Sequence, residues 1–382
     1  MTNQFLLDPT VTFLNQGSFG ATPRPVFAAY QRWQRELERQ PLEFLDRRAR
    51  GLLQAARERV AGYLGTEAQN LVFVTNTTTG INMVARSLKL GPDDEVLTTD
   101  HEYGALNRTW DYLAGRSGFS YRHYTVQLPL TTREAFVEQL WSEVTPRTRV
   151  IFISQITSPT ALIFPVAEVC RRAREAGILT VVDGAHVPGQ LPLNLDTLGA
   201  DFYSGNLHKW LCAPKGCAIL YARPEVQSLL EPLVMGWGWR GLGPSPSPLI
   251  DLYQDQGTRD LAPFLSSMAA LDYVESSGWS QLRERCHALA GRAQQGVVSI
   301  TGLAPLHPDS PEFYGMMAAA PLPPCPAKPL QAWLYQNHRI EIPVFDWNGR
   351  QLIRASFFRY SRQRDLDKLL EVLPRALEAV RA

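Results

Sequence analysis

The sequence predicts an α/β fold, with a mostly parallel central sheet flanked by helices and a smaller α+β unit towards the C-terminus. Short apolar runs rich in β-branched residues recur along the first two thirds of the chain, with helical patterns between them. Strands that are apolar throughout are typical of a parallel sheet covered on both faces, and alternating strands and helices supply parallel connections. After about residue 260 helices are followed by short strands, which indicates the second unit.

The expected elements follow in chain order. A helical, arginine-rich segment runs from Pro25 to about Gly65. The strands of the large unit are predicted at residues 71–74, 95–99, 149–154, 178–182 and 217–221, with helices near 132–144 and 165–176. The last part is expected to hold helices, short strands at 339–344 and 351–357, and an amphipathic helix at about 364–381. We therefore expect a large domain over residues 16–260 and a small domain over residues 261–382, with residues 1–15 packing on the small domain.

Composition argues against several classes of protein. The 382 residues are 45% hydrophobic and 20% charged with a formal net charge of +1, so we expect no nucleic-acid partner and no membrane partner. The five cysteines form neither a disulfide framework nor a metal-ligand spacing, so no metal is expected. No stretch is long and apolar enough to span a bilayer, and the first residues lack the pattern of a signal peptide. The expected location is the cytoplasm.

A polar turn, TNTTTG at residues 75–80, lies between a predicted strand and a helical pattern. The free N–H groups at the start of a helix suit a phosphate, and the hydroxyls of Thr77 and Thr78 add donors. A helix N-cap would account for one Thr or Asn without any ligand. Three consecutive threonines exceed what capping needs, and the two interpretations stay open on this stretch alone.

Two further groups stand at predicted strand ends. Asp183 follows the strand at 178–182, and Lys209 lies among small and aromatic residues before another apolar strand. A buried lysine must find a partner or lose its charge, and a neutral lysine is a nucleophile that forms Schiff bases with carbonyls. An anion site, a carboxylate and an amine are the three groups that pyridoxal phosphate requires, so the sequence predicts this cofactor. A metal at Asp183 is the weaker interpretation because only His186 is nearby.

Several motifs carry a resemblance to a known family. The chain has VDGAH at residues 182–186, NLHKW at 206–210, PKG at 214–216, LNQGSFG at 14–20, TSPT at 157–160, GWGW at 236–239 and PVFDWNGR at 343–350. Together with the Thr77 and Thr78 turn, these resemble the class V branch of fold-type I pyridoxal-phosphate enzymes over nearly the whole chain. The nearest subgroup is similar to isopenicillin N epimerase-like proteins.

The resemblance implies roles for the cofactor-binding residues. Lys209 would be the Schiff-base lysine and main proton carrier, Asp183 would pair with the pyridine nitrogen, and His186 would reach the ring oxygen or the aspartate. The phosphate would be held by Thr77, Thr78 and His208, with Ser158 near the ring hydroxyl. Thr258 matches a position that reaches the phosphate from the partner subunit, which implies a homodimer.

The resemblance also implies a substrate site. Arg354 matches the arginine that clamps the substrate α-carboxylate, a task that suits its planar fork. The loop that contains Asn15 and the tryptophan-rich loop from Trp237 are expected to shape the pocket. Either His101 or Tyr103 would stack on the cofactor ring, and the other would be an acid-base group or a supporting residue.

The reaction is less defined than the cofactor. Desulfurases of the family carry a nucleophilic cysteine shortly before the arginine, but residues 339–353 contain none and Cys325 lies too far upstream, so desulfuration is not expected. The leading prediction is an epimerase acting at the α-carbon of an amino acid or amino-acid conjugate. Lys209 would serve one face of the carbanion, and His101 or Tyr103 the other. A carbon–sulfur β-lyase or an aminotransferase is the alternative. A binder without chemistry is disfavoured by the intact set of Lys209, Asp183 and Arg354.

Overall fold

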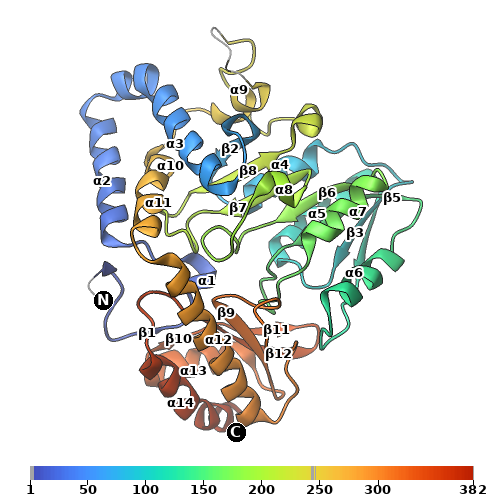
Figure 1. Cartoon of the computed structure of the whole chain (residues 1–382), viewed down its shortest axis with the longest axis vertical. Coiled ribbons are helices and arrows are strands. Elements are labelled where there is room, and N and C mark those ends of the chain that lie inside the picture. The colour runs from blue at the N-terminus through green and yellow to red at the C-terminus, as the bar shows by residue number, and fades with distance from the viewer. Residues whose placement is uncertain (1–3, 242–244, 246, 382) are drawn as a thin grey trace.

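The computed structural model describes residues 4–241, 245 and 247–381. Its main sheet has seven strands in the order β2-β8-β7-β6-β5-β3-β4 (Figure 1). The strands are β2 (Leu71–Val74), β3 (Glu95–Thr99), β4 (Ser120–Tyr124), β5 (Thr148–Ser154), β6 (Leu179–Asp183), β7 (Phe202–Asn206) and β8 (Ala218–Ala222). The run from β7 to β4 is parallel throughout, whereas β8 is antiparallel to both of its neighbours. The predicted α/β fold with a mostly parallel sheet is therefore confirmed.

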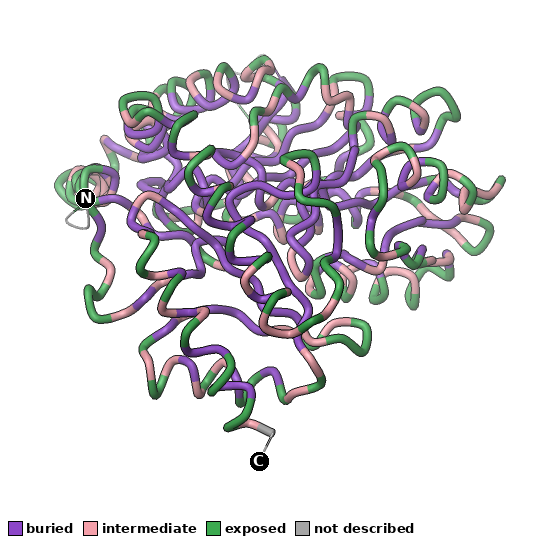
Figure 2. Tube along the Cα trace, turned by 60° about the horizontal axis from the view of Figure 1, so that its bottom comes forward, coloured by how far each residue is buried: buried purple, intermediate pink, exposed green. Residues whose placement is uncertain are grey.

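Helices cover both faces of this sheet, and successive residues of each strand enter two different cores. In β6, Val182 packs into one core and Val181 into the other. The buried trace in Figure 2 runs through the middle of the molecule, with exposed residues on the surrounding helices. The covering helices near the sheet are α4 (Thr77–Ser87), α5 (Gly104–Ser117), α6 (Arg133–Ser142), α7 (Val166–Glu175), α8 (Leu195–Leu198) and α9 (Pro248–Gln254). This burial on both faces explains the apolar character of the central strands.

The N-terminal helices form a layer beside the sheet. They are α1 (Gln16–Phe19), α2 (Arg24–Arg39) and α3 (Ala49–Leu64), with a π-helical segment, Glu43–Arg48, between the last two. The helices α10 (Ala262–Leu265) and α11 (Ser267–Glu275) pack against α2 and α3. The long helix α12 (Trp279–Thr301) then leads to the lower part of the molecule in Figure 1. Short 3-10 helices occupy Ala68–Asn70 and Pro224–Leu229.

The lower part is built on a second, antiparallel sheet. Its order is β11 (Val344–Trp347), β12 (Arg350–Ser356) and β9 (Met317–Leu322), and it is flanked by α12, α13 (Ala327–His338) and α14 (Gln363–Arg381). A separate parallel pair joins β1 (Thr12–Phe13) to β10 (Ile340–Glu341). The single strand predicted at 339–344 is therefore wrong, since β10 and β11 belong to different sheets. Pro343 between them lacks an N–H group, and its carbonyl accepts the amide of Arg354.

The strands β4 and β9 are among those not predicted from the sequence. β4 reads Ser-Tyr-Arg-His-Tyr and lies at the edge of the sheet, and β9 reads Met-Ala-Ala-Ala-Pro-Leu, so neither shows the β-branched pattern of a strand.

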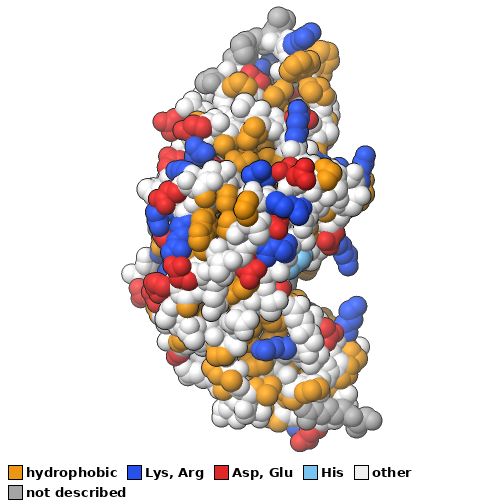
Figure 3. All heavy atoms as spheres, turned by 90° about the vertical axis from the view of Figure 1, so that its right-hand side faces the viewer, with side chains coloured by type: hydrophobic (Ala, Val, Ile, Leu, Met, Phe, Trp, Pro, Cys, Tyr) orange, Lys and Arg blue, Asp and Glu red, His pale blue; other side chains and the backbone are white. Residues whose placement is uncertain are grey.

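The glycine- and proline-rich loop after Met235 falls partly outside the described residues. Within the described chain, no helix combines the length and the apolarity that crossing a bilayer requires. On the face in Figure 3, basic and acidic side chains are interspersed, in keeping with the net charge of +1.

Candidate active site

Polar side chains collect at one edge of the main sheet. The strands β3, β5, β6 and β7 are parallel, and β2 points the same way because two antiparallel pairings separate it from β7. Their carboxyl ends therefore lie along one edge, where α/β proteins bind ligands. Thr77, His101, Asp183 and Lys209 all follow directly after, or end, one of these strands.

The turn between β2 and α4 offers unused donors. Asn76 is the N-cap of α4, and its Oδ1 accepts the amide of Thr79 at 2.8 Å. The capping role thus falls to Asn76, which leaves the threonines available. The hydroxyl of Thr77 is buried and has no hydrogen-bond partner in the described part of the chain, and Thr78 is half-buried in the first turn. A buried hydroxyl without a partner fits an anionic ligand such as a phosphate.

Asn206 completes this turn and was not predicted from the sequence. Its Oδ1 accepts the backbone N–H of Thr77 at 3.0 Å, although the two residues are 129 positions apart. Because Oδ1 is the acceptor, the amide of Asn206 has its two N–H donors available beside the helix terminus. The only signal for Asn206 in the sequence is that it is a polar residue at the end of β7, where the NLHKW motif begins.

His208 follows β7 on the same side. Its Nδ1 lies 3.1 Å from the carbonyl of Cys217, so the ring donates there and Nε2 carries the lone pair in the neutral form. Burial, with a smaller contribution from the nearby Lys209, lowers the pKa of His208 to about 4. An anion at Nε2 would favour the protonated ring, which fits the predicted phosphate role.

Asp183 ends β6 and is buried. Its Oδ1 accepts the amide of Ala185 at 2.8 Å, whereas Oδ2 accepts no hydrogen bond from the residues described. Burial raises the pKa of Asp183 to about 6, while Lys209 opposes the rise. A carboxylate on a buried residue, with one oxygen that accepts no hydrogen bond from the described chain, fits a protonated ring nitrogen.

A second carboxyl, Glu102, lies near Asp183 and was not predicted. Its two oxygens accept hydrogen bonds from the hydroxyls of Thr99 at 2.7 Å and Ser154 at 2.5 Å. Burial raises the pKa of Glu102 to about 8 despite the hydrogen bonds, and Asp183 adds to the rise. A pKa of about 8 favours the protonated form of Glu102 at neutral pH, in which the carboxyl O–H donates to one of these two hydroxyls, and the charge of the pair stays on Asp183.

Lys209 is buried and lies against His186. The distance between Lys209 Nζ and His186 Nε2 is 3.2 Å, and the indole N–H of Trp210 donates to His186 Nδ1 at 3.3 Å. Because Nδ1 accepts, a neutral His186 carries its proton on Nε2 and donates it to Lys209. The lysine amine must then be neutral. Burial lowers the pKa of Lys209 to about 7, and Arg354 contributes to the decrease.

The glycine-containing loop of α1 holds the backbone of Lys209. Gln16 donates from Nε2 to the carbonyl of Lys209 at 2.8 Å, and its Oε1 accepts from Ala21 and from the hydroxyl of Tyr360. Gly20 has φ of 74°, and a Cβ there would lie 2.2 Å from the carbonyl oxygen of His208. Only glycine permits this approach, so the loop predicted to shape the pocket also packs against the lysine segment.

Arg354, Ser158 and Asn15 belong to one hydrogen-bond network. Arg354 on β12 is 1% exposed and donates to the carbonyl and the hydroxyl of Ser158. Its guanidinium also lies 3.3 Å from Ser18 Oγ. The Ser18 hydroxyl in turn donates to Asn15 Oδ1 at 2.5 Å. The guanidinium also stacks on Phe345 at 5.0 Å. Among the residues described, no carboxylate pairs with Arg354, and burial lowers its pKa to about 10. A buried cation without a counter-charge fits a ligand carboxylate.

His101 and Tyr103 differ in environment. His101 is fully buried, packs edge-on against Trp347 at 4.4 Å and Phe164 at 5.6 Å, and its Nε2 has no partner among the described residues. Tyr103 is 46% exposed at the start of α5. Within this chain, His101 is therefore the better placed of the two for contact with an enclosed ligand.

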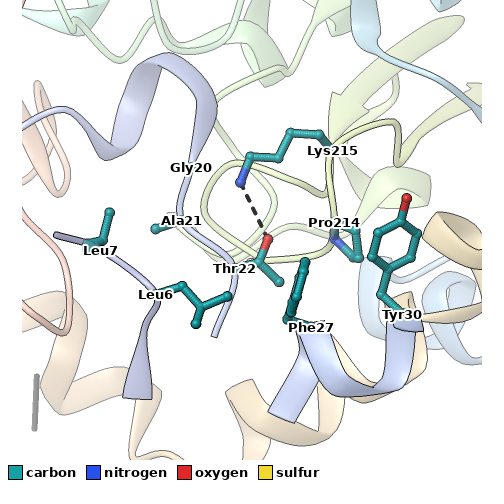
Figure 4. Close-up of a pocket in the computed structure, with 9 residues that line it drawn as sticks. All are labelled: Leu6, Leu7, Gly20, Ala21, Thr22, Phe27, Tyr30, Pro214 and Lys215. Carbon is teal, nitrogen blue, oxygen red and sulfur yellow. Dashed lines mark hydrogen bonds between the residues drawn. The ribbon is translucent and has the colours of Figure 1, made fainter. Parts of the chain in front are cut away.

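Thr258 does not join the cluster. Its side chain is exposed, and it lines a surface hollow of about 510 Å³ beside Arg259 and residues of α2 and the π-helical segment. A second hollow, of about 320 Å³, lies beyond the loop after Lys209, where Lys215 and Thr22 are 3.5 Å apart (Figure 4). None of the residues predicted to bind cofactor or substrate lines this second hollow.

Four buried polar atoms around the edge of the sheet lack partners in the described chain. They are Thr77 Oγ1, His101 Nε2, Arg354 Nε and Ser356 Oγ. Each such atom costs roughly 1–3 kcal/mol unless a ligand or water satisfies it. The residues present therefore fit a ligand with an anionic end, a ring nitrogen and a carbonyl carbon within reach of Lys209.

Comparisons with known proteins agree with this site. Residues 20–369 match the family model of class-V aminotransferases. The chain is 37% identical to isopenicillin N epimerase of Amycolatopsis lactamdurans, over 97% of this chain and 96% of that protein, and 36% identical to the Streptomyces clavuligerus enzyme over the same shares. In fold it is similar to the Escherichia coli cysteine desulfurase CsdA, with a TM-score of 0.82, 24% identity and coverage of 99% and 98% of the two chains. It is also similar to the cystine C–S lyase C-DES in complex with cysteine persulfide, with a TM-score of 0.85, 21% identity and coverage of 96% and 98%.

The structural neighbours are below 25% identity and show the fold alone, but the family match and the epimerase relatives span almost the whole chain. The predicted fold-type I architecture and cofactor are confirmed on this basis. This chain belongs to the class-V aminotransferase family and is an enzyme that depends on pyridoxal 5'-phosphate.

Proposed function

We propose that this enzyme epimerises or racemises an amino acid or an amino-acid conjugate at its α-carbon. The observation that carries the proposal is the presence of two buried proton carriers that follow parallel strands at the same edge of the sheet: the neutral amine of Lys209 after β7, and the Nε2 of His101 after β3, which has no partner in the described chain. An epimerase needs a proton carrier for each face of its substrate. The two epimerase relatives, at 37% and 36% identity over 97% of the chain, support the same reaction.

One group of residues would hold the cofactor. Thr77, Thr78 and His208 would hold the phosphate, Asp183 would accept the pyridinium N–H, and His186 would hydrogen-bond near the ring oxygen. Bound pyridoxal phosphate supplies an electron sink for the negative charge that develops on the substrate α-carbon.

Arg354 would bind the substrate carboxylate and orient the α-carbon. Its fork geometry selects a planar carboxylate, and the rigid Phe345 ring supports the guanidinium from one side. Ser158 belongs to this end of the site, since it contacts Arg354 directly. Asn15 holds Ser18 in place and so acts at the same end.

His101 is preferred over Tyr103 as the second proton carrier. Its burial excludes water from Nε2, and a proton carrier is most selective when solvent does not compete. The half-exposed position of Tyr103 in a single chain supports a different role for that residue.

A β-lyase on the same scaffold is the second candidate. Hercynylcysteine sulfoxide lyase of Schizosaccharomyces pombe is 24% identical over 98% of this chain and 96% of that protein. In such a reaction His101 would protonate the leaving group. Desulfuration through a persulfide is not proposed, because four of the five cysteines are buried and Cys325 precedes α13 rather than the β11–β12 turn.

Incubation with candidate amino acids in deuterated water tests the proposal. We expect label at the α-carbon and formation of both enantiomers, with loss of both in Lys209→Ala. The His101→Gln variant should still exchange the α-proton of one enantiomer, because Lys209 remains. Release of ammonia and a keto acid would replace the epimerase with a lyase, and accumulation of pyridoxamine phosphate would indicate an aminotransferase.

We also propose a homodimer in which Thr258 reaches the phosphate site of the partner. Its exposure on the surface, apart from Thr77, supports this arrangement. Light scattering should give twice the mass of one chain, and Thr258→Ala should weaken cofactor binding. A monomer that still holds the cofactor tightly would contradict the proposal.

A further inference from the structure

We propose that Asp100 is a positioning residue that makes His101 the second base, and that the β11–β12 hairpin holds Asp100 in place for this purpose. The inference rests on the proposed function, because it explains how one of the two proton carriers acquires its lone pair. Asp100 itself does not contact the reacting atoms; it acts through the imidazole ring.

The contact between the two residues determines which ring nitrogen is protonated. Asp100 Oδ1 lies 2.8 Å from His101 Nδ1, and the side chains are 14% and 0% exposed. A carboxylate only accepts hydrogen bonds, so Nδ1 carries the proton and Nε2 carries the lone pair. Nε2 is the atom that has no partner in the described part of the chain. The pair thus leaves a buried basic nitrogen that no described residue of the chain occupies.

Asp100 is itself fixed by residues from two other segments. Its Oδ1 accepts the amide of Val126 at 3.1 Å, its Oδ2 accepts from Asn348 Nδ2 at 2.8 Å, and its carbonyl accepts the indole N–H of Trp347 at 3.1 Å. Although burial opposes ionisation, the hydrogen bond with His101 lowers the pKa of Asp100 below its usual value. The carboxylate is therefore charged and rigidly oriented.

The hairpin that supplies these contacts also supplies the substrate clamp. Asn348 and Gly349 form its two-residue turn, with φ values of 47° and 73°, an arrangement typical of Asn-Gly hairpins. Trp347 on β11 contacts the ring of His101, and Arg354 lies on β12. One hairpin therefore links recognition of the carboxylate to support of the base.

Each proton that moves has a source and a destination. Lys209 is neutral before the substrate binds, and it takes up a proton from the substrate ammonium group. His101 Nε2 then takes a proton from the α-carbon and becomes an imidazolium, which the adjacent Asp100 carboxylate stabilises, while the Lys209 ammonium gives its proton to the other face of the same carbon. The product amino group regains a proton on release and His101 loses one, so both residues return to their starting forms. In the reverse direction, neutral Lys209 takes the proton from the α-carbon and protonated His101 supplies one. Burial lowers the pKa of His101, Asp100 opposes this, and Arg350 on β12 lowers it slightly. Phe164 and Trp347, which also pack on the ring, do not titrate.

The test compares Asp100→Asn with Asn348→Ala in the holoenzyme. An asparagine amide is uncharged and can donate to Nδ1, which moves the histidine proton to Nε2. We expect exchange of the enantiomer whose proton goes to His101 to fall by at least about 10²-fold in Asp100→Asn, while exchange of the other enantiomer is retained. Asn348→Ala keeps the carboxylate and should lose less than Asp100→Asn.

A second readout separates positioning from simple packing. Nitrogen-15 NMR of histidine-labelled apoprotein, with the His101 signals assigned by His101→Gln, should show Nδ1 protonated in the wild type and Nε2 protonated in Asp100→Asn. An equal loss of exchange for both enantiomers, or an unchanged tautomer, would overturn the proposal. If the wild type proves to be a lyase, the NMR result still decides the role of Asp100 independently of the proposed function.

Discussion

His186 Nε2 lies 3.2 Å from Lys209 Nζ, and Trp210 donates to the other nitrogen of the same ring. This chain of donors requires a neutral lysine amine, which is the form that attacks an aldehyde. Capture of pyridoxal phosphate by the apoprotein should therefore become faster as the pH rises through about 7, where the buried Lys209 has its pKa, and level off above it.

Removing the indole donor should move this pH dependence. In Trp210→Phe, the proton of His186 is free to move to Nδ1, and Nε2 then accepts from a charged Lys209. We expect the midpoint of the capture rate to rise, measured by stopped-flow absorbance of the lysine-bound cofactor. Trp333→Phe on α13 is the matched control. An unchanged midpoint in Trp210→Phe would contradict the assigned tautomer.

The buried hydroxyl of Thr77 should contribute to phosphate affinity. Thr77→Val keeps the shape but removes the hydroxyl, and loss of a hydrogen bond to a charged group costs about 1.5–3 kcal/mol. The Kd of the cofactor, from equilibrium dialysis, should rise by about 10- to 150-fold. Thr79→Val tests the specificity of this effect, because Thr79 Oγ1 already bonds to Asn76 and Thr75. Equal losses in the two variants would show that the helix terminus, and not the hydroxyl, was affected.

Arg354 should improve substrate binding at the expense of stability. It is a buried cation with no carboxylate partner among the described residues, so Arg354→Met removes a desolvation cost. We expect the free energy of unfolding of the apoprotein to rise by about 1–3 kcal/mol and KM to rise by about 10²-fold or more. Urea unfolding and steady-state kinetics measure the two effects. Arg350→Met, at an exposed position of the same strand, should change neither substantially; a less stable Arg354→Met protein would refute the trade-off.

Glu102 should make the apoprotein less stable as the pH rises. Its pKa is raised by burial from 4.5 to about 8, so between these values the folded state binds more protons than the unfolded state. The stabilisation is complete below about pH 4.5 and decreases towards pH 8, with a slope of about 1.4 kcal/mol per pH unit for one proton. In Glu102→Gln the slope of the free energy of unfolding between pH 5 and pH 8 should be smaller. Glu134→Gln, on the surface of α6, should retain the wild-type slope, and identical slopes in all three proteins would disprove the assignment.

The sequence predicted those parts of the site that follow strand ends. Asp183 and Lys209 stand out because each polar residue follows or ends a buried strand, and this local pattern survives in the fold. Thr77 stands out for the same reason. Arg354 and Ser158 were placed by resemblance, and the structure brings them into direct contact.

Other groups could not be predicted, because their partners are distant in the sequence. The bond between Asn206 and Thr77 spans 129 positions, and Asn348 is 248 positions from Asp100. In the sequence, Glu102 is indistinguishable from an ordinary surface glutamate. Its burial becomes evident only when β5 and β6 are placed beside it in the fold. Side-chain direction at a strand end depends on pairing between strands, which local pattern does not contain.

The two separate cores of the main sheet have a consequence for the evolution of the chemistry. Val181 and Val182 of β6 face opposite layers, and Asp183 continues this alternation. An insertion of one residue within β6 would move every following side chain to the opposite face of the sheet. A valine would then enter the wrong core layer, and the Asp183 carboxylate would point away from the lysine. Selection for valines that fill both core layers therefore also preserves the residue register of β6. The same register keeps the side chain of Asp183 directed towards the lysine.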